Sequence, residues 1–79
     1  MRYVYVLRSE VDSSKRYVGI TSDLKKRIKD HNSGQSAYTS KYKPWKLETY
    51  IAFSDYHRAQ LFEKYLKTGS GKAFSSKRL

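Results

Sequence analysis

The sequence predicts an α+β fold, in which a small three-stranded antiparallel sheet is flanked by two or three helices as an α/β sandwich. Two observations lead to this prediction. Three short segments, 3–7, 16–20 and 47–53, are rich in the aromatic and β-branched residues that are typical of strands. Two further segments, about 23–32 and 55–68, carry apolar residues at helical spacing and follow the second and third of these strands.

The first two strands are expected to form a hairpin. Residues 8–15 between them are polar and rich in turn-forming types, so the chain should reverse there. The reversal places Tyr5 and Tyr17 on neighbouring strands. Because side chains alternate along a strand, the two tyrosines of 3–7 share one face of the sheet and its two central valines share the other.

A basic helix is expected directly after the second strand. The segment Thr21–Asp23 supplies capping oxygens and a negative charge for its N-terminus. The helix should run over about 23–32, and Gly34 suits a C-terminal cap. Leu24 and Ile28 form its short apolar stripe, while its lysines point to solvent.

The second half of the chain should contain a loop, the third strand and a second helix. Residues 35–46 are polar and include the one proline, which predicts a loop. The second helix should open at Ser54–Asp55 and reach about Thr68. A break is expected at Gly69–Gly71, followed by a short basic helix or tail over 72–79.

Composition narrows the function. Lys and Arg number 17 against 7 Asp and Glu, a net charge of +10, which favours nucleic acid through counterion release. A solubilising surface, or a ribosome- or membrane-surface patch, is the alternative. The absence of cysteine excludes disulfides, thiolate nucleophiles and cysteine-ligated zinc. No apolar run approaches the ~20 residues that span a bilayer. The apolar run at the N-terminus is too short for a signal peptide. We expect one domain over 1–79, cytoplasmic, with no membrane partner.

Arg27 and His31 are candidates for phosphate chemistry. They lie four positions apart, hence on one helix face, beside the Leu24–Ile28 stripe that should meet the sheet edge. An arginine can form two hydrogen bonds to a phosphate, and a neutral histidine can accept a proton from water or a phenol. A surface-covering arginine and a hydrogen-bonded structural histidine are the alternatives.

Glu63 is the acid that stands out. It adjoins the apolar stripe of the second helix, whereas the other acids lie in the hairpin loop, at helix starts, on the basic face or along a strand. A half-buried carboxylate needs a cation or a metal, so pairing with Arg27 or a lysine is the structural alternative. Tyr5 and Tyr17 are either core rings or phenols that position a water. The ordered set of five residues is more informative than any single member.

In this order the residues resemble the active-site set of the GIY-YIG nuclease family. Tyr3–Tyr5 and Tyr17–Gly19 resemble its two tyrosine motifs, although the first lacks the family's glycine and isoleucine. The segment Tyr17–Asn32 is similar to compact, stand-alone bacterial members, and the resemblance extends from Tyr3 to about Gly71. It implies a metal-dependent phosphodiesterase with a tyrosine-rich sheet.

The resemblance also implies a role for each residue. Arg27 binds the scissile phosphate, and Glu63 is the sole protein ligand of one Mg²⁺ or Mn²⁺ ion. Tyr5 holds or deprotonates the attacking water with His31 as proton acceptor. Tyr17 bonds a phosphate oxygen or that water.

Nucleic acid is expected to contact basic and aromatic residues along the chain, with Tyr42 and Trp45 packed under the loop as the alternative for those two rings. The expected contacts are Lys25, Lys26, Lys29, Tyr38, Lys41, Tyr42, Lys43, Lys72, Lys77 and Arg78. The predicted function is that of a DNA endonuclease in repair or recombination, acting on duplex, branched or single-stranded DNA as a monomer or weak homodimer. A non-catalytic module that binds DNA or RNA, and a subunit that cuts only with a partner, are the alternatives.

Overall fold

The computed structural model describes residues 1–78, except for the side chains of Ser75, Ser76 and Arg78. These residues fold into three strands and four helices. The strands form one antiparallel sheet of order β2-β1-β3, and they are β1 (Arg2–Ser9), β2 (Arg16–Thr21) and β3 (Trp45–Phe53). The helices are α1 (Leu24–Ser33), α2 (Ala37–Lys41), α3 (Tyr56–Leu66) and α4 (Gly69–Arg78). The predicted α+β fold class is confirmed.

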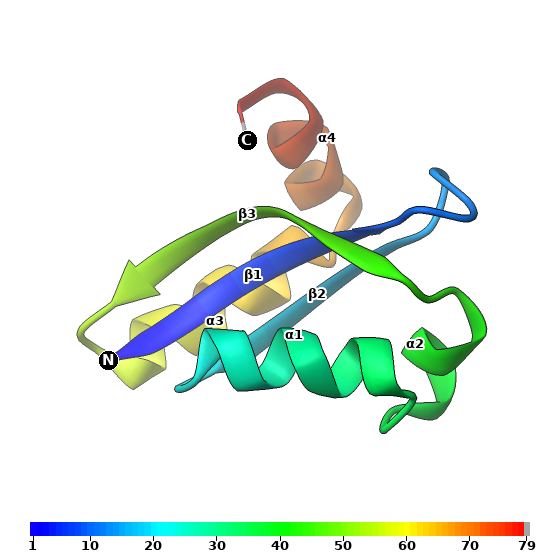
Figure 1. Ribbon diagram of the computed structural model, residues 1–79. Coiled ribbons are helices and arrows are strands. Elements are labelled where there is room, and N and C mark those ends of the chain that lie inside the picture. The colour runs from blue at the N-terminus through cyan, green and yellow to red at the C-terminus, as the bar shows by residue number, and fades with distance from the viewer. Residues whose placement is uncertain (79) are drawn as a thin grey trace.

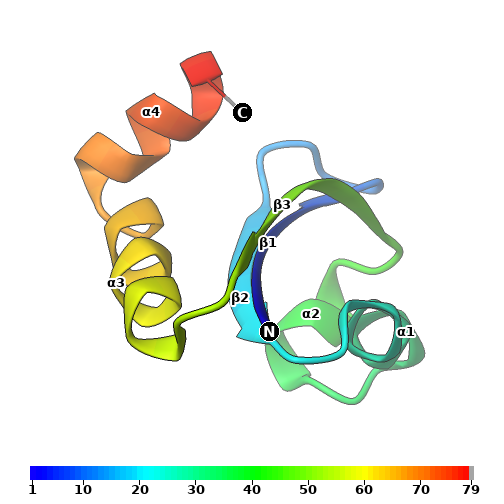
Figure 2. The same ribbon diagram turned by 90° about the vertical axis from the view of Figure 1, so that its left-hand side faces the viewer.

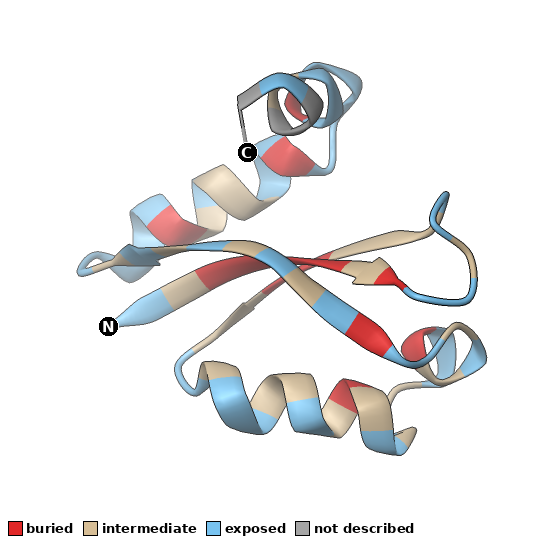
Figure 3. Cartoon of the chain, turned by 45° about the horizontal axis from the view of Figure 1, so that its top comes forward, coloured by how far each residue is buried: buried red, intermediate tan, exposed pale blue. Residues whose placement is uncertain are grey.

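The sheet separates two pairs of helices. Helices α1 and α2 cover one face, and α3 and α4 lie on the other (Figures 1 and 2). Strand β1 is central and carries the largest share of the buried positions (Figure 3). Strand β2 forms one edge of the sheet, so groups from the helices of both faces can meet around it.

Alternation along β1 gives the sheet two apolar faces, as predicted. Val4 and Val6 pack with Ala59 and Leu66 of α3. Tyr5 packs on the opposite face, in a cluster that contains the apolar residues of α1. All five of these side chains are at most 1% exposed. The tyrosine face is therefore the face on which α1 lies.

The starts of α1 and α3 and the end of α1 follow the predicted caps, whereas α3 ends at Leu66 rather than at about Thr68. The carboxylate of Asp23 accepts a hydrogen bond from the backbone N–H of Lys26 at the start of α1, and Gly34 ends that helix in the left-handed conformation at φ 88°. The carboxylate of Asp55 accepts from the N–H of His57 at the start of α3. Among residues 1–78, no helix is long and apolar enough to cross a membrane.

Two predictions for the connecting segments are wrong. Residues 35–46 are not only a loop, because α2 lies within them and β3 begins at Trp45 rather than at residue 47. The Gly69–Gly71 segment is not a break but the first turn of α4. Gly71 is buried, and a Cβ on it would collide with the carbonyl of Tyr65, so this glycine permits close packing of two helices. Residue Leu79 of the predicted tail lies outside the described residues.

Candidate active site

The strand register brings the two predicted tyrosines together on the face of α1. Tyr5 pairs with Gly19 across the sheet, and Tyr17 lies two residues earlier on β2. A Cβ at position 19 would collide with the phenol of Tyr5, so glycine there leaves room for the ring to cross β2. The rings of Tyr5 and Tyr17 lie 6.3 Å apart between centroids.

His31 meets Tyr5 in the interior. The Tyr5 hydroxyl lies 2.8 Å from Nε2 of His31, and both residues are almost completely buried. The imidazole also packs against the Tyr17 ring, with 4.7 Å between the ring centroids. Burial, and then the charge of Arg27, lower the pKa of His31, although Asp30 acts in the other direction. His31 is therefore a neutral imidazole at neutral pH.

Thr39 is a site residue that the sequence did not reveal. Its hydroxyl lies 2.8 Å from Nδ1 of His31 and 3.5 Å from the carbonyl of Ser36, and its side chain is fully buried. When the threonine proton points to Ser36, Nδ1–H donates to Thr39 and Nε2 is free to accept from Tyr5. With its hydroxyl turned this way, Thr39 of α2 favours the tautomer that can accept a proton from the phenol.

Arg27 lies one helical turn before His31 and interacts with both phenols. Burial lowers its pKa, but the hydrogen bonds and negative potential of Tyr5 and Tyr17 outweigh this and raise the pKa overall. The guanidinium is half-buried and permanently charged. The predicted face shared by Arg27 and His31 therefore does meet the edge of the sheet.

Tyr5 is held as a neutral phenol. Burial raises its pKa to about 12, with smaller upward effects from Tyr17 and Glu63, while the hydrogen bond and charge of Arg27 oppose the rise. The influence of Glu63 is informative because its helix, α3, covers the opposite face of the sheet. Glu63 therefore acts on the Tyr5 phenol weakly and from the other side of the sheet.

Glu63 has a partner in this structure. Its carboxylate is half-buried, with 17% of the side chain exposed, and forms an ion pair of 2.9 Å with the Lys67 ammonium. The described residues contain no group of three or more His, Cys, Asp or Glu side chains that could hold a metal. A single carboxylate suits Mg²⁺ or Mn²⁺, which keep several waters, and does not suit a tetrahedral zinc site. Glu63 thus fits the implied metal.

The predicted nucleic-acid contacts fall on two sides of the molecule. Those on α1, on α2 and in the segment after it are exposed lysines, together with Tyr38, which is 48% exposed. Lys72 and Lys77 are exposed on α4, which lies beyond the other face of the sheet (Figure 2), and the side chain of Arg78 lies outside the described residues. The predicted contacts whose side chains are described therefore do not form one continuous surface.

Trp45 and Tyr42 pack in the hydrophobic core. Trp45 is 3% exposed, and its Nε1–H donates to the carbonyl of Thr39 at 2.7 Å. Tyr42 packs against the same cluster. The alternative interpretation of these two rings, as packing under the segment 35–46, is the one that the structure supports.

The fold and the motif spacing point to one family. The family model described as the GIY-YIG catalytic domain matches residues 1–77. The chain belongs to the GIY-YIG family. The predicted family resemblance is thereby confirmed, and the protein has a nuclease-type fold.

Relatives of this GIY-YIG chain are small bacterial proteins. A UPF0213 protein of Clostridium perfringens is 43% identical over 68 residues, covering 85% of this chain and 71% of the relative. A UPF0213 protein of Bacillus pumilus is 39% identical over 71 residues, covering 89% and 70%. The solution NMR structure of a UPF0213 protein from Bacillus halodurans is similar with a TM-score of 0.59 at 31% identity, covering 98% of this chain and 84% of that one.

Tyr5 should make this GIY-YIG domain sensitive to alkaline pH. Its pKa rises from 10.0, the ordinary value of a tyrosine, to about 12 in the folded state, so the folded state holds the proton more tightly. The resulting stability is fully present below about pH 10 and is lost as the pH rises towards about 12, a difference of about 2–3 kcal/mol. Urea unfolding of the wild type and Tyr5→Phe over this range measures it. Parallel stability curves for the two proteins would contradict the raised pKa.

Proposed function

We propose that this protein is a metal-dependent endonuclease that hydrolyses phosphodiester bonds in DNA. The observation that supports this most directly is the buried hydrogen bond between Tyr5 and His31, 26 residues apart, beside the charged group of Arg27. A phenol, a neutral imidazole and a guanidinium in contact are unusual for a purely structural core, because each must be desolvated. Together they supply a proton path and a phosphate anchor.

The proton path runs from the attacking water through Tyr5 to His31. With a pKa of about 12, Tyr5 does not ionise on its own at neutral pH. It accepts the water proton only as its own proton passes to Nε2 of His31. The oxygen of that water forms a bond to phosphorus, the bond from phosphorus to the leaving oxygen breaks, and this oxygen takes a proton from solvent. His31 returns its proton to solvent after the products leave.

Arg27 and Tyr17 would hold the phosphate during this step. The guanidinium lies beside the phenols of Tyr5 and Tyr17, which raise its pKa, and its fork geometry suits two oxygens of a phosphate. Its charge is preorganised at the place where negative charge develops, so it need not be reoriented during the reaction. Tyr17 is half-buried next to it and can donate a hydrogen bond to a phosphate oxygen.

Glu63 is the residue that would hold Mg²⁺ or Mn²⁺. A divalent ion bound there supplies charge neutralisation to the phosphate and the leaving oxygen. The ion pair of Glu63 with Lys67 does not prevent this, because the lysine is 52% exposed and such pairs contribute only about 0–1 kcal/mol. Lys67 can therefore release the carboxylate at little cost.

Positive surface charge supports DNA as the substrate. Exposed lysines of α1 and of the segment that follows α2 lie on the same side of the sheet as the candidate site and would contact the DNA backbone. We further propose that the chain acts as one domain, as a monomer or weak homodimer in the cytoplasm. Repair or recombination substrates with unpaired strands fit the exposed Tyr38 among these lysines, since an aromatic ring can stack on an unpaired base.

A second candidate function is a nucleic-acid-binding module that does not cut, with DNA or RNA as its partner. The observation that favours it is the ion pair of Glu63 and Lys67, which satisfies the carboxylate without a metal. This candidate keeps the positive charge and gives the buried polar residues a structural role only.

A cleavage assay separates the two candidates. Labelled single-stranded, flapped and duplex DNA would be incubated with the protein, with Mg²⁺ or Mn²⁺ present or removed by a chelator. Endonuclease activity predicts cleavage of at least one substrate that requires the metal and scales with protein concentration. Binding of all three substrates without any cleavage would support the binding module instead.

Thr39→Val is expected to slow cleavage about tenfold or more, because Nδ1 of His31 loses its partner and the acceptor tautomer is no longer selected. Stability should fall by about 1–3 kcal/mol, the cost of a buried unpaired donor. Thr39→Ser keeps the hydroxyl and should restore the rate and the acid limb of its pH profile. Equal rates for Thr39→Val and Thr39→Ser would show that the threonine does not position His31.

A further inference from the structure

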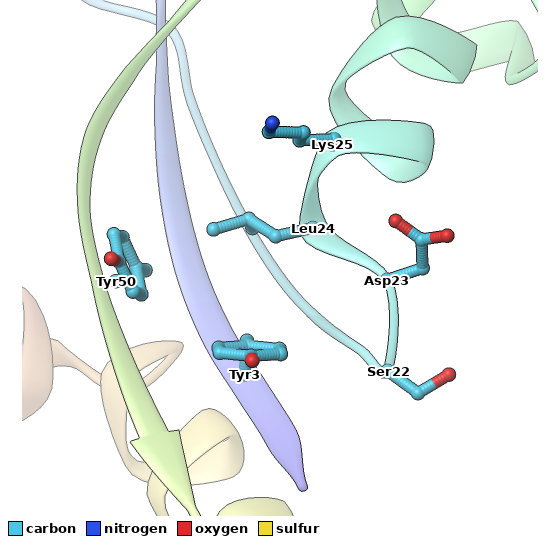
Figure 4. A pocket seen from close by; sticks show the side chains of 6 residues that line it. All are labelled: Tyr3, Ser22, Asp23, Leu24, Lys25 and Tyr50. Atoms are coloured by element: carbon cyan, nitrogen blue, oxygen red, sulfur yellow. The ribbon is translucent and has the colours of Figure 1, made fainter.

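A second feature of the tyrosine face lies outside the proton path. A pocket of about 360 Å³ opens between the sheet and the start of α1. It is lined by Tyr3, Ser22, Asp23, Leu24, Lys25 and Tyr50 (Figure 4). Its size lies at the lower end of the range for small-molecule sites, about 300–1,000 Å³. None of these residues takes part in the proton path, and only Lys25 is among the lysines proposed to contact the DNA backbone.

The pocket is aromatic on the sheet side. The rings of Tyr3 and Tyr50 are in edge contact, 6.0 Å between centroids at 67°, and Leu24 points towards them from α1 (Figure 4). Tyr50 is 50% exposed although it sits in the middle of a strand, directly opposite the fully buried Tyr5. An exposed ring on an otherwise covered face offers a stacking surface.

The pocket is better suited to a base than to a phosphate. The N–H groups at the start of α1 are already partly satisfied by Asp23, whose carboxylate accepts from Lys26, and this negative charge would repel a phosphate. The cation at the rim, Lys25, is exposed and can reach a neighbouring backbone phosphate instead. Tyrosine and leucine walls with a single outer lysine match a planar base attached to a charged backbone.

The position of the pocket relates it to the candidate active site. Tyr3 and Tyr5 point to the same face of β1 and are two residues apart, hence about 7 Å along the strand. This corresponds to about two nucleotides at the ~3.4 Å rise of a stacked strand, and to one where the strand is more extended. A base in the pocket would therefore belong to a nucleotide next to, or one removed from, the phosphate at Arg27.

We infer that this pocket is a subsite for one unpaired nucleobase of the DNA strand, which stacks on Tyr50 and Tyr3 while Lys25 holds the backbone. The inference rests on the proposed function in that DNA is the ligand. Only an unpaired base can expose a face to a ring on a sheet, so the subsite would favour single-stranded or frayed DNA over intact duplex.

The test uses DNA that carries a single base. A fluorescent oligonucleotide made of abasic nucleotides, with one 2-aminopurine in its centre, is compared with the same oligonucleotide without any base. The full chain is used in the presence of a chelator, so that binding is measured by anisotropy without cleavage. The fully abasic strand isolates the phosphate contribution. The wild type should bind the strand with one base about tenfold more tightly.

Variants of Tyr50 assign this gain to the pocket. Tyr50→Leu should bind both strands equally, whereas Tyr50→Phe, which keeps the ring, should retain the tenfold preference. Tyr56→Leu is the matched control, because Tyr56 is 47% exposed on α3 at the other side of the sheet and should also retain the preference. Circular dichroism verifies that each variant is folded.

Two results would overturn the subsite. One is equal binding of the two strands by the wild type, and the other is a preference that survives in Tyr50→Leu. Neither depends on cleavage, so failure of the proposed nuclease function is detected separately. A protein that cuts DNA but shows no preference for the single base keeps its proposed function and loses the subsite. A protein that shows the preference but never cuts keeps the subsite alone.

Discussion

Glu63→Gln is expected to reduce metal-dependent cleavage to background, a loss of at least about 10³-fold. The reason is that the described residues provide no cluster of further ligands, so removal of this one charge leaves the metal without a protein anchor. The charge stabilisation that a metal supplies in the transition state is several kcal/mol, and each 1.36 kcal/mol changes the rate about tenfold. Initial rates over a range of Mg²⁺ concentrations measure the effect.

Lys67→Gln provides the matched control for this prediction. It breaks the same ion pair but leaves the carboxylate in place, so cleavage should persist and the Mg²⁺ concentration for half-maximal rate should fall. If Glu63 serves only to pair with Lys67, the two variants should instead behave alike. Equal cleavage by Glu63→Gln and the wild type would rule out the metal assignment.

The strands and the helices α1 and α3 were predictable because their signals are local. The alternation of tyrosine and valine in β1 fixes which residues share a face, and Asp23 and Asp55 supply side-chain caps at the observed helix starts. Gly34 lies in the left-handed conformation that such a cap requires. Each of these features depends on a few neighbouring residues, so the sequence alone contains the necessary information.

The segment 35–46 was not predictable in the same way. Its helix α2 has only five residues, too few for a periodic pattern, and it is held by long-range contacts. Thr39 is buried against His31, and Asn32 accepts from the N–H of Trp45 at 2.6 Å and so fixes the start of β3. A polar composition predicts a loop unless these partners, which come from other elements, are known.

The candidate site also combines features that follow from local sequence with features that depend on packing. Its five residues could be selected from their order and chemical type, and the helical spacing of Arg27 and His31 placed them on one face. The direct bond from Tyr5 to His31, and the threonine behind it, depend on how α1 and α2 settle on the sheet. Likewise, Gly71 was predicted to lie in a break, but it permits close packing of α3 and α4, which depends on the three-dimensional arrangement.

Arg27→Lys is expected to lower kcat/KM for cleavage by at least about 10²-fold, the effect of removing one preorganised group that stabilises transition-state charge. Lysine keeps the positive charge but lacks the fork that lies beside both phenols and that would bind two phosphate oxygens under the proposed function. Lys29→Gln is the control, since Lys29 is an exposed lysine on α1, two positions from Arg27. Its cleavage should change only through weaker binding of DNA.

Arg27→Gln separates the charge of the arginine from its geometry. The charge lowers the pKa of His31, so its removal should raise that pKa. The acid limb of the pH–rate profile, which reports protonation of the acceptor histidine, should then move to higher pH. In Arg27→Lys the charge remains, so the limb should stay in place while the rate falls. A limb that does not move in Arg27→Gln would show that His31 is not the group that accepts the proton.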